Sequence, residues 1–181
     1  MKKKLPLSKV YQLLGFGPVV FITSALKGKA NIMPISWLMP VDFDPPKIAV
    51  IIGDQSYTFK IISRTREFVI NIPTADLIKK VMACGDCSGR NTNKFKKFKL
   101  TPLPSKIVKA PGIHECPVNI ECKVIDSSLA GKYYIFLAQA KACRVENGLF
   151  KRCYRVDKNK FKPLFYLGQG SFTVPDKIRR G

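Results

Sequence analysis

The residues most suggestive of chemistry lie in one short stretch, MACGDCSGRNTNKF, residues 82–95. It holds a CxxC pair, Cys84 and Cys87, followed at once by the polar turn SGRN (residues 88–91) and then by Lys94. Two chemistries are open to this stretch. The cysteines could form a thiol or metal site, or the polar residues after them could bind an anion.

The metal and redox interpretations of the cysteines have weak support. A zinc site needs four ligands, commonly from two CxxC pairs or from added histidines. The chain has six cysteines but one CxxC pair and one histidine, His114, while Cys116 and Cys122 fall in an expected strand region. The pair also ends the helix-patterned residues 74–84, where the helix dipole disfavours a thiolate. The sequence therefore favours reduced, packed thiols, as expected in a cytosol.

The polar residues offer the parts of a phosphate site. Hydroxyls, backbone N–H groups at a helix start and a cation are the groups that hold a phosphate. They occur in residues 56–58, at the start of an expected helix, and again in residues 88–91 with Lys94. Ordinary helix capping and solvated charge account for the same residues, so both interpretations stay open. The single tryptophan, Trp37, could shield an aromatic ligand or serve as core.

Protein-supplied catalysis has little support in this sequence. No GxSxG, HExxH, P-loop or GxGxxG pattern occurs, and His114 has no neighbouring Ser or Cys placed for a triad. An enzyme of this sequence would therefore depend on a bound cofactor for its reactive group.

Strands dominate the elements that must position these residues. Apolar β-branched runs predict strands at residues 19–26, 47–53 and 67–72 and two more within 118–145, whereas the prolines of residues 31–46 predict a strand with an irregular loop. Helical patterns are short and cover residues 9–14, 56–64, 74–84 with Thr74 as N-cap, and 91–98 with Asn91 or Thr92 as N-cap. The second half lacks regular strand-helix alternation, which favours an all-β barrel or α+β fold over a doubly wound sheet.

The bulk composition predicts a single domain over residues 1–181, with residues 1–14 as an N-terminal extension and 173–181 as a C-terminal tail. No apolar run approaches the roughly 20 residues of a membrane span, and the first residues do not fit a signal peptide, so we expect a cytoplasmic protein. The formal charge of +20, from 32 Lys and Arg against 12 Asp and Glu, invites a nucleic-acid-binding alternative. Charge alone does not establish that partner.

Five segments, read in order, resemble the flavin reductase-like, FMN-binding split-barrel proteins of the flavoredoxin type. They are NIMPISWLMPVDFDPPKIAVIIG, SYTFKIISRTREFVINIPTADL, CGDCSGRNTNKF, KAPGIHECPVNIECKV and PLFYLGQGSF. The resemblance implies a mainly β fold, a Greek-key antiparallel β-barrel with flanking helices, and a homodimer that binds FMN near the subunit interface. No single motif is diagnostic, but the order and spacing of the five are specific.

The resemblance also implies a set of site residues and no catalytic residue or metal, because the flavin carries the chemistry. Asn31 and Trp37 match positions that border the flavin ring in this family, and Lys94 matches a lysine that contacts the flavin phosphate. The residues expected around the flavin or its phosphate are Asn31, Met33, Pro34, Ile35, Ser36, Trp37, Gln55, Ser56, Tyr57, Thr58, Ser88, Gly89, Arg90, Asn91 and Lys94. Cys87 departs from the pattern, so the cysteine pair inherits no redox role.

The implied function is an FMN-binding oxidoreductase that transfers electrons from NAD(P)H or a redox partner to flavin, ferric iron or a protein acceptor. A flavoredoxin-like electron carrier without its own NAD(P)H turnover is the first alternative. A split barrel that holds haem or F420 is the second. The third is a basic nucleic-acid-binding module, in which Phe95, Phe98 and Phe161 would stack on bases among the lysines.

Overall fold

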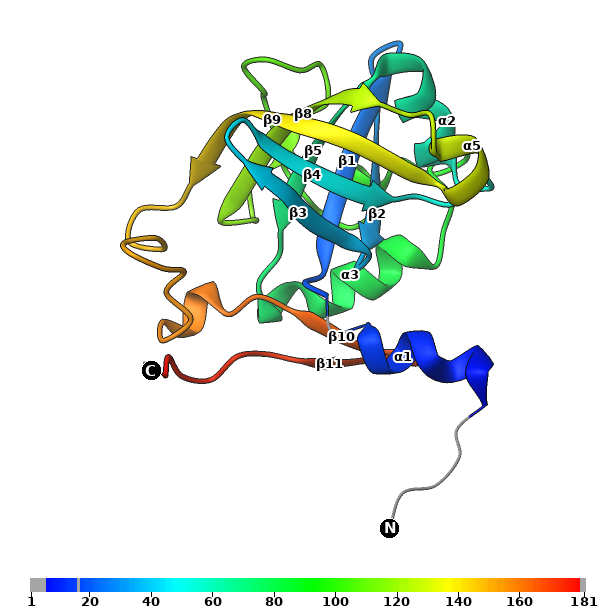
Figure 1. Ribbon diagram of the computed structural model, residues 1–181. Helices are drawn as coiled ribbons and strands as arrows, with labels where there is room; N and C mark the ends of the chain where they lie inside the picture. Colours follow the sequence, from blue (N-terminus) through cyan, green and yellow to red (C-terminus); the bar gives the residue numbers. More distant parts are fainter. Residues whose placement is uncertain (1–5, 16, 180–181) are drawn as a thin grey trace.

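Seven antiparallel strands form the main sheet of the protein, whose computed structural model describes residues 6–15 and 17–179. The strand order is β2-β1-β5-β8-β9-β4-β3, so β2 and β3 are the two edges (Figure 1). The strands are β1 (Val20–Leu26), β2 (Lys29–Ile35), β3 (Leu38–Phe43), β4 (Pro46–Ile51), β5 (Glu67–Ile72), β8 (Val118–Asp126) and β9 (Ile135–Val145). The mainly β class predicted from the sequence is thus observed.

Two small hairpins and several short helices surround this sheet. The hairpins are β6 (Pro102–Leu103) with β7 (Gly112–Ile113), and β10 (Phe165–Gly168) with β11 (Ser171–Thr173). The α-helices are α1 (Val10–Leu14), α2 (Tyr57–Thr65), α3 (Ile78–Gly85), α4 (Lys94–Lys97) and α5 (Ala130–Tyr133), and the 3₁₀ helices are η1 (Leu7–Lys9), η2 (Ala75–Leu77) and η3 (Asn159–Phe161). Among the described residues, no helix is long and apolar enough to cross a membrane.

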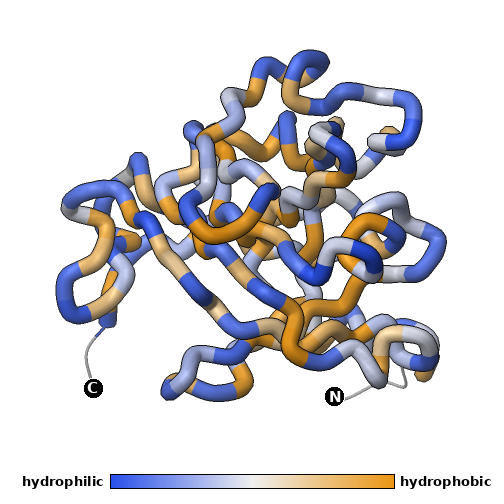
Figure 2. Tube along the Cα trace, turned by 90° about the horizontal axis from the view of Figure 1, so that it is seen from above, coloured by the Kyte–Doolittle hydropathy of each residue, from blue (hydrophilic) through white to orange (hydrophobic). Residues whose placement is uncertain are grey.

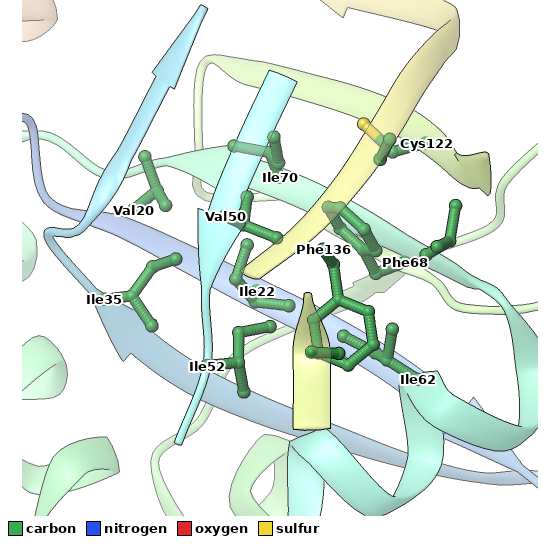
Figure 3. Packing of buried hydrophobic residues seen from close by; sticks show 13 residues of the cluster. Val20, Ile22, Ile35, Val50, Ile52, Ile62, Phe68, Ile70, Cys122 and Phe136 are labelled. Atoms are coloured by element: carbon green, nitrogen blue, oxygen red, sulfur yellow. The ribbon is translucent and has the colours of Figure 1, made fainter. Parts of the chain in front are cut away.

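Both faces of strand β1 are buried, which explains its unbroken apolar sequence. Val20 and Ile22 point into an apolar cluster enclosed by the sheet, to which Phe136 of β9 also belongs (Figure 3). The alternate residue Phe21 points to the other face and packs with Val81 of α3. Hydropathy along the chain follows the same division, with apolar residues gathered inside and polar residues at the outer turns (Figure 2). Each fully buried side chain of this size contributes about 1.5–3 kcal/mol.

The strand predicted within residues 31–46 is present, but the prediction of an irregular loop beside it is wrong. Those residues form most of β2 and β3, and Pro34 and Pro40 lie inside the strands. A proline cannot donate to a strand ladder, but an edge strand has one side without a partner. Because the sheet order places β2 and β3 at the two edges, both prolines are accommodated, and the pairing of β3 with β4 shifts register just after Pro40.

The expected helices occur, with differences at their starts. Ser56 caps α2, since its Oγ accepts a hydrogen bond from the N–H of Phe59 at 3.0 Å. Helix α4 is capped by Asn93 rather than by Asn91 or Thr92, because the Asn93 side chain reaches the N–H of Lys96. Thr74 precedes η2 and makes no side-chain cap; its hydroxyl donates to Asp76 instead. In helices this short, local geometry decides which residue caps the N-terminus.

A buried carboxylate fixes the loop between β6 and β7. Glu121 of β8 is 1% exposed and accepts hydrogen bonds from the backbone N–H groups of Lys106, Ile107 and Val108. Arg144 lies 3.5 Å from the same carboxylate. Burial alone would raise the pKa of Glu121, but these N–H donors and the arginine outweigh it and hold the pKa below its usual value.

We expect Glu121→Gln to lower the free energy of unfolding by about 2 kcal/mol at pH 7, because the amide cannot accept all of these charge-assisted bonds. A carboxyl group with a lowered pKa stabilises the fold above its unfolded pKa and loses that contribution as the pH falls through its folded pKa. Urea unfolding at pH 7 and at steps toward pH 3 should therefore show the gap between the two proteins closing. A gap that is constant with pH would contradict the ionised state of Glu121.

Candidate functional site

A cavity of about 440 Å³ lies where β2, the start of α2 and the segment after α3 meet. Its wall consists of Asn31, Met33, Pro34, Gln55, Ser56, Tyr57, Thr58, Cys84, Gly85, Asp86, Cys87, Ser88, Gly89, Arg90 and Lys94. Segments far apart in the sequence therefore form one site. It combines hydroxyl, amide and cationic groups from the two stretches that the sequence offered as phosphate sites.

Four of the expected site residues lie outside this wall. Ile35 packs in the apolar cluster inside the sheet. Ser36 and Trp37 line a different, mostly apolar cavity of about 340 Å³, where the ring of Tyr11 meets that of Trp37 edge-on at 6.1 Å. Asn91 lines a separate groove on the far side of the 88–91 turn.

Asn31 carries a hydrogen-bonding atom without a protein partner. Its side chain is 3% exposed, and its Nδ2 donates to Oγ1 of Thr58 at 2.8 Å. Its Oδ1 is buried in the cavity wall and finds no donor among the described residues. A buried acceptor without a partner costs free energy, so this oxygen is suited to a donor on a ligand.

Gly89 allows the 88–91 turn to pack directly against Asn31. A Cβ atom added at Gly89 would lie 1.8 Å from Oδ1 of Asn31, far inside contact distance. A glycine is therefore required at this position by close approach, since no larger residue fits without moving the asparagine.

Lys94 places a buried ammonium group in the wall of the cavity. Its side chain is 4% exposed, and its Nζ donates to the backbone oxygens of Ile32 at 2.8 Å and Cys84 at 2.6 Å. No carboxylate pairs with it in the part of the chain that the structure describes. Burial lowers the pKa of Lys94, because removal from water disfavours the charged form.

An ammonium group has three donors, and the two carbonyl oxygens occupy two of them. A buried cation without a counter-ion is costly to the fold, and an anionic ligand group reduces that cost. The start of α2 adds a second anion-binding element, because the first N–H groups of a helix lack intrahelical acceptors. Arg90 holds the two parts together, donating from Nη2 to the backbone oxygen of Gln55 at 3.1 Å.

The cysteines lie at the end of α3, as the sequence predicts. Cys84 is in the last turn and fully buried, and burial raises the pKa of its thiol to about 12. Cys87 donates from Sγ to the backbone oxygen of Ala83 at 3.6 Å. Both line the cavity, together with Gly85 and Asp86, which the sequence reasoning did not include. Their position directly before the polar turn is the sequence feature that could have identified all four as site residues.

No group of three or more His, Cys, Asp or Glu side chains in residues 6–15 and 17–179 is placed to hold a metal ion. The chemistry of the cavity is therefore that of hydrogen-bond donors and acceptors, the Asp86 carboxylate and the buried positive charge of Lys94.

Known proteins are similar to this chain in sequence and in fold. The sequence matches the family model of the flavin reductase like domain over residues 16–174. A protein of Archaeoglobus fulgidus is 39% identical over 111 residues, which are 61% of this chain and 63%, less than two thirds, of that relative. The structure of flavoredoxin of Desulfovibrio vulgaris (Miyazaki F) is similar over 100% of this chain and 97% of its own, with a TM-score of 0.87 and 24% identity.

The structure of an FMN-binding domain of a flavin reductases-like enzyme from Shewanella baltica OS155 is also similar. It covers 98% of this chain and 95% of its own, with a TM-score of 0.86 and 24% identity. The sheet and its helices thus form the FMN-binding split-barrel fold. The chain belongs to the flavin reductase like domain family, which confirms the family and fold expected from the sequence.

We expect Gly89→Ala to weaken flavin binding at least tenfold, because the new methyl group displaces Asn31 and breaks its bond to Thr58. Titration with FMN, followed by quenching of flavin fluorescence, measures this change. Gly53→Ala serves as the matched control, since an added Cβ there meets no atom within 4 Å. Equal affinities for the two variants would contradict the role of the Gly89–Asn31 contact.

Proposed function

We propose that the protein is an FMN-binding oxidoreductase that passes electrons from NAD(P)H or a redox partner through the flavin to flavin, ferric iron or a protein acceptor. The observation that carries the proposal is the buried Lys94 ammonium group, which lies without a carboxylate partner in a cavity of an FMN-binding fold. The unpaired Oδ1 of Asn31 in the same wall supports it.

The residues of the cavity suit the two ends of FMN. Lys94 and the N–H groups at the start of α2 match the charge of a phosphate. The free acceptor on Asn31 matches the ring N–H of a flavin, while Met33 and Pro34 supply apolar contact. Bound FMN supplies the redox chemistry, and the protein supplies position and a partly dry, positively charged surrounding.

The nucleic-acid alternative loses its main structural support. Phe95 and Phe161, two of its three proposed stacking residues, are 7% and 1% exposed and pack in apolar clusters. Buried rings cannot stack on bases. A carrier role without NAD(P)H turnover shares the same cavity and is an outcome of the experiment below. Haem or F420 in place of FMN would be distinguished by the absorbance spectrum of the protein as purified.

We expect the protein to take up FMN and turn yellow, and Lys94→Ala to weaken this binding about tenfold to a hundredfold, since a charge-assisted hydrogen bond contributes about 1.5–3 kcal/mol. Cys87→Ala, a change in the same wall, should alter the affinity less than about twofold. The wild-type affinity should also fall with alkaline pH, starting below the ordinary lysine pKa of 10.5, because Lys94 has a lowered pKa.

Absorbance spectra of the purified protein, before and after addition of FMN, provide the measurement. Protein that is colourless after FMN has been added and the unbound flavin removed by gel filtration would remove the proposal, and equal losses in the two variants would contradict the role of Lys94. Bleaching of the flavin by NADH or NADPH, with continued turnover, identifies a reductase. Bleaching by a reduced redox protein alone identifies a carrier.

We further propose that the protein forms a homodimer through the β3 edge of the sheet. Met39, Val41 and Phe43 alternate along β3 and are 61%, 49% and 92% exposed. Trp37, 49% exposed, extends this apolar surface toward α1, beside the cavity of about 340 Å³. An exposed apolar edge strand is a poor surface for a lone chain and is suited to a second copy.

We expect Phe43→Asp to convert the protein to a monomer, because the new charge would be buried in the apolar interface. Multi-angle light scattering after gel filtration, over a range of protein concentrations, measures the mass. Phe150→Asp makes the same change at an exposed phenylalanine outside β3 and should leave the mass unchanged. A wild-type protein with the mass of one chain at high concentration would remove this proposal.

A further inference from the structure

A third cavity, of about 740 Å³, lies across the 88–91 turn from the cavity of about 440 Å³ that contains Lys94, which we call the flavin cavity. We call this third cavity the cationic groove. Its wall consists of Ala25, Lys27, Gly28, Lys29, Ala30, Gly89, Arg90, Asn91, Thr92, Asn93, Phe95, Pro102, Lys109 and Pro111. Gly89 and Arg90 belong to both walls, so the two cavities adjoin at these residues.

The groove is strongly positive. Lys27, Lys29, Arg90 and Lys109 line it, and no Asp or Glu does. None of the three lysines makes an ion pair within the described residues. Cations that converge on a concave surface without carboxylates produce a field that attracts anions, and the low-dielectric walls concentrate it.

The rest of the wall is suited to a flat ring as well as to phosphate. Ala25, Ala30 and the two prolines supply apolar surface, and residues 91–93 supply amide and hydroxyl groups. The volume falls within the range of small-molecule sites. Apolar surface edged by cations is the combination that a phosphorylated nucleoside needs.

The turn that carries Lys27 and Gly28 has an unusual sequence for its conformation. Both residues have positive φ, 50° and 77°. A two-residue hairpin turn of this kind favours Asn-Gly, because a lysine in the left-handed region is disfavoured. The hairpin thus carries Lys27 at the rim of the groove, in a position where the backbone conformation favours asparagine over lysine.

We propose that the cationic groove binds the 2′-phosphorylated adenosine end of NADPH, and that the protein therefore prefers NADPH to NADH. This proposal rests on the proposed function, because the other end of the dinucleotide must reach the flavin cavity beyond Gly89 and Arg90. The extra phosphate of NADPH is the group that three unpaired lysines distinguish, since NADH lacks it.

The test uses FMN-loaded protein and two nucleotide fragments, adenosine 2′,5′-bisphosphate and 5′-AMP, with binding measured by calorimetry at fixed ionic strength. We expect the bisphosphate to bind at least tenfold more tightly than 5′-AMP. Lys29→Ala/Lys109→Ala should weaken bisphosphate binding at least tenfold and raise KM for NADPH, with FMN uptake and the melting temperature unchanged, since neither lysine lines the flavin cavity.

The matched control is Lys123→Ala/Lys141→Ala, which removes the same charge from exposed positions on β8 and β9. It should change bisphosphate binding less than about twofold. An equal effect of the two double variants would show a general charge effect and overturn the proposal, as would equal affinity for the two fragments. Loss of FMN uptake in Lys29→Ala/Lys109→Ala would assign the groove to the flavin phosphate and also overturn it.

These outcomes separate the inference from the proposed function. Protein that takes up no FMN contradicts the proposed function, yet its groove can still be assayed with the bisphosphate. Protein that takes up FMN and oxidises NADH and NADPH with equal KM contradicts the groove assignment alone.

Discussion

The buried ammonium group of Lys94 joins three parts of the molecule that the sequence keeps far apart. Its Nζ bonds to Ile32 on β2 and to Cys84 at the end of α3, while Lys94 itself begins α4. These bonds bring the 88–91 turn against β2 and so create the cavity. Two carbonyl oxygens compensate a buried cation only in part, so the site is arranged for negative charge before any ligand arrives. In the free protein, this arrangement reduces stability in favour of binding.

The edges of the sheet have a similar double role. Because β2 and β3 are edge strands, they tolerate Pro34 and Pro40, and each leaves one side of its backbone without a strand partner. At β2 the helices α3 and α4 and the polar turn cover the strand, and the cavity forms beneath them. At β3 no described element pairs with the outer side, and apolar side chains extend from it. One edge thus holds the site, and the other carries exposed apolar side chains.

Much of the fold followed from local patterns. The β-branched runs of β1, β4 and β5, the start of α2 near residue 56 and the helix before Cys84 depend on near neighbours, so the sequence alone predicted them. Pro34 and Pro40 misled the prediction because their effect depends on strand order, which is a property of the whole sheet. The bonds from Glu121 to residues 106–108 were equally hidden, since nothing local to a glutamate on a strand identifies distant amides as its partners. The candidate site residues came mainly from family resemblance, and geometry then separated Trp37, Ser36, Ile35 and Asn91 from the cavity.

Acidic residues near the cationic groove bond to backbone rather than to lysine. Glu121 accepts from residues 106–108 and Glu67 accepts from the N–H of Lys109, so carboxylates fix the loop, while the Lys109 side chain makes no ion pair among the described residues. Because carboxylates are few and those near the groove bond to backbone N–H groups, the positive field extends into the solvent over about a Debye length. Negatively charged molecules are therefore drawn to this side of the protein before they make contact. The rate at which an anionic molecule first encounters the protein therefore depends on the ionic strength of the surrounding solution.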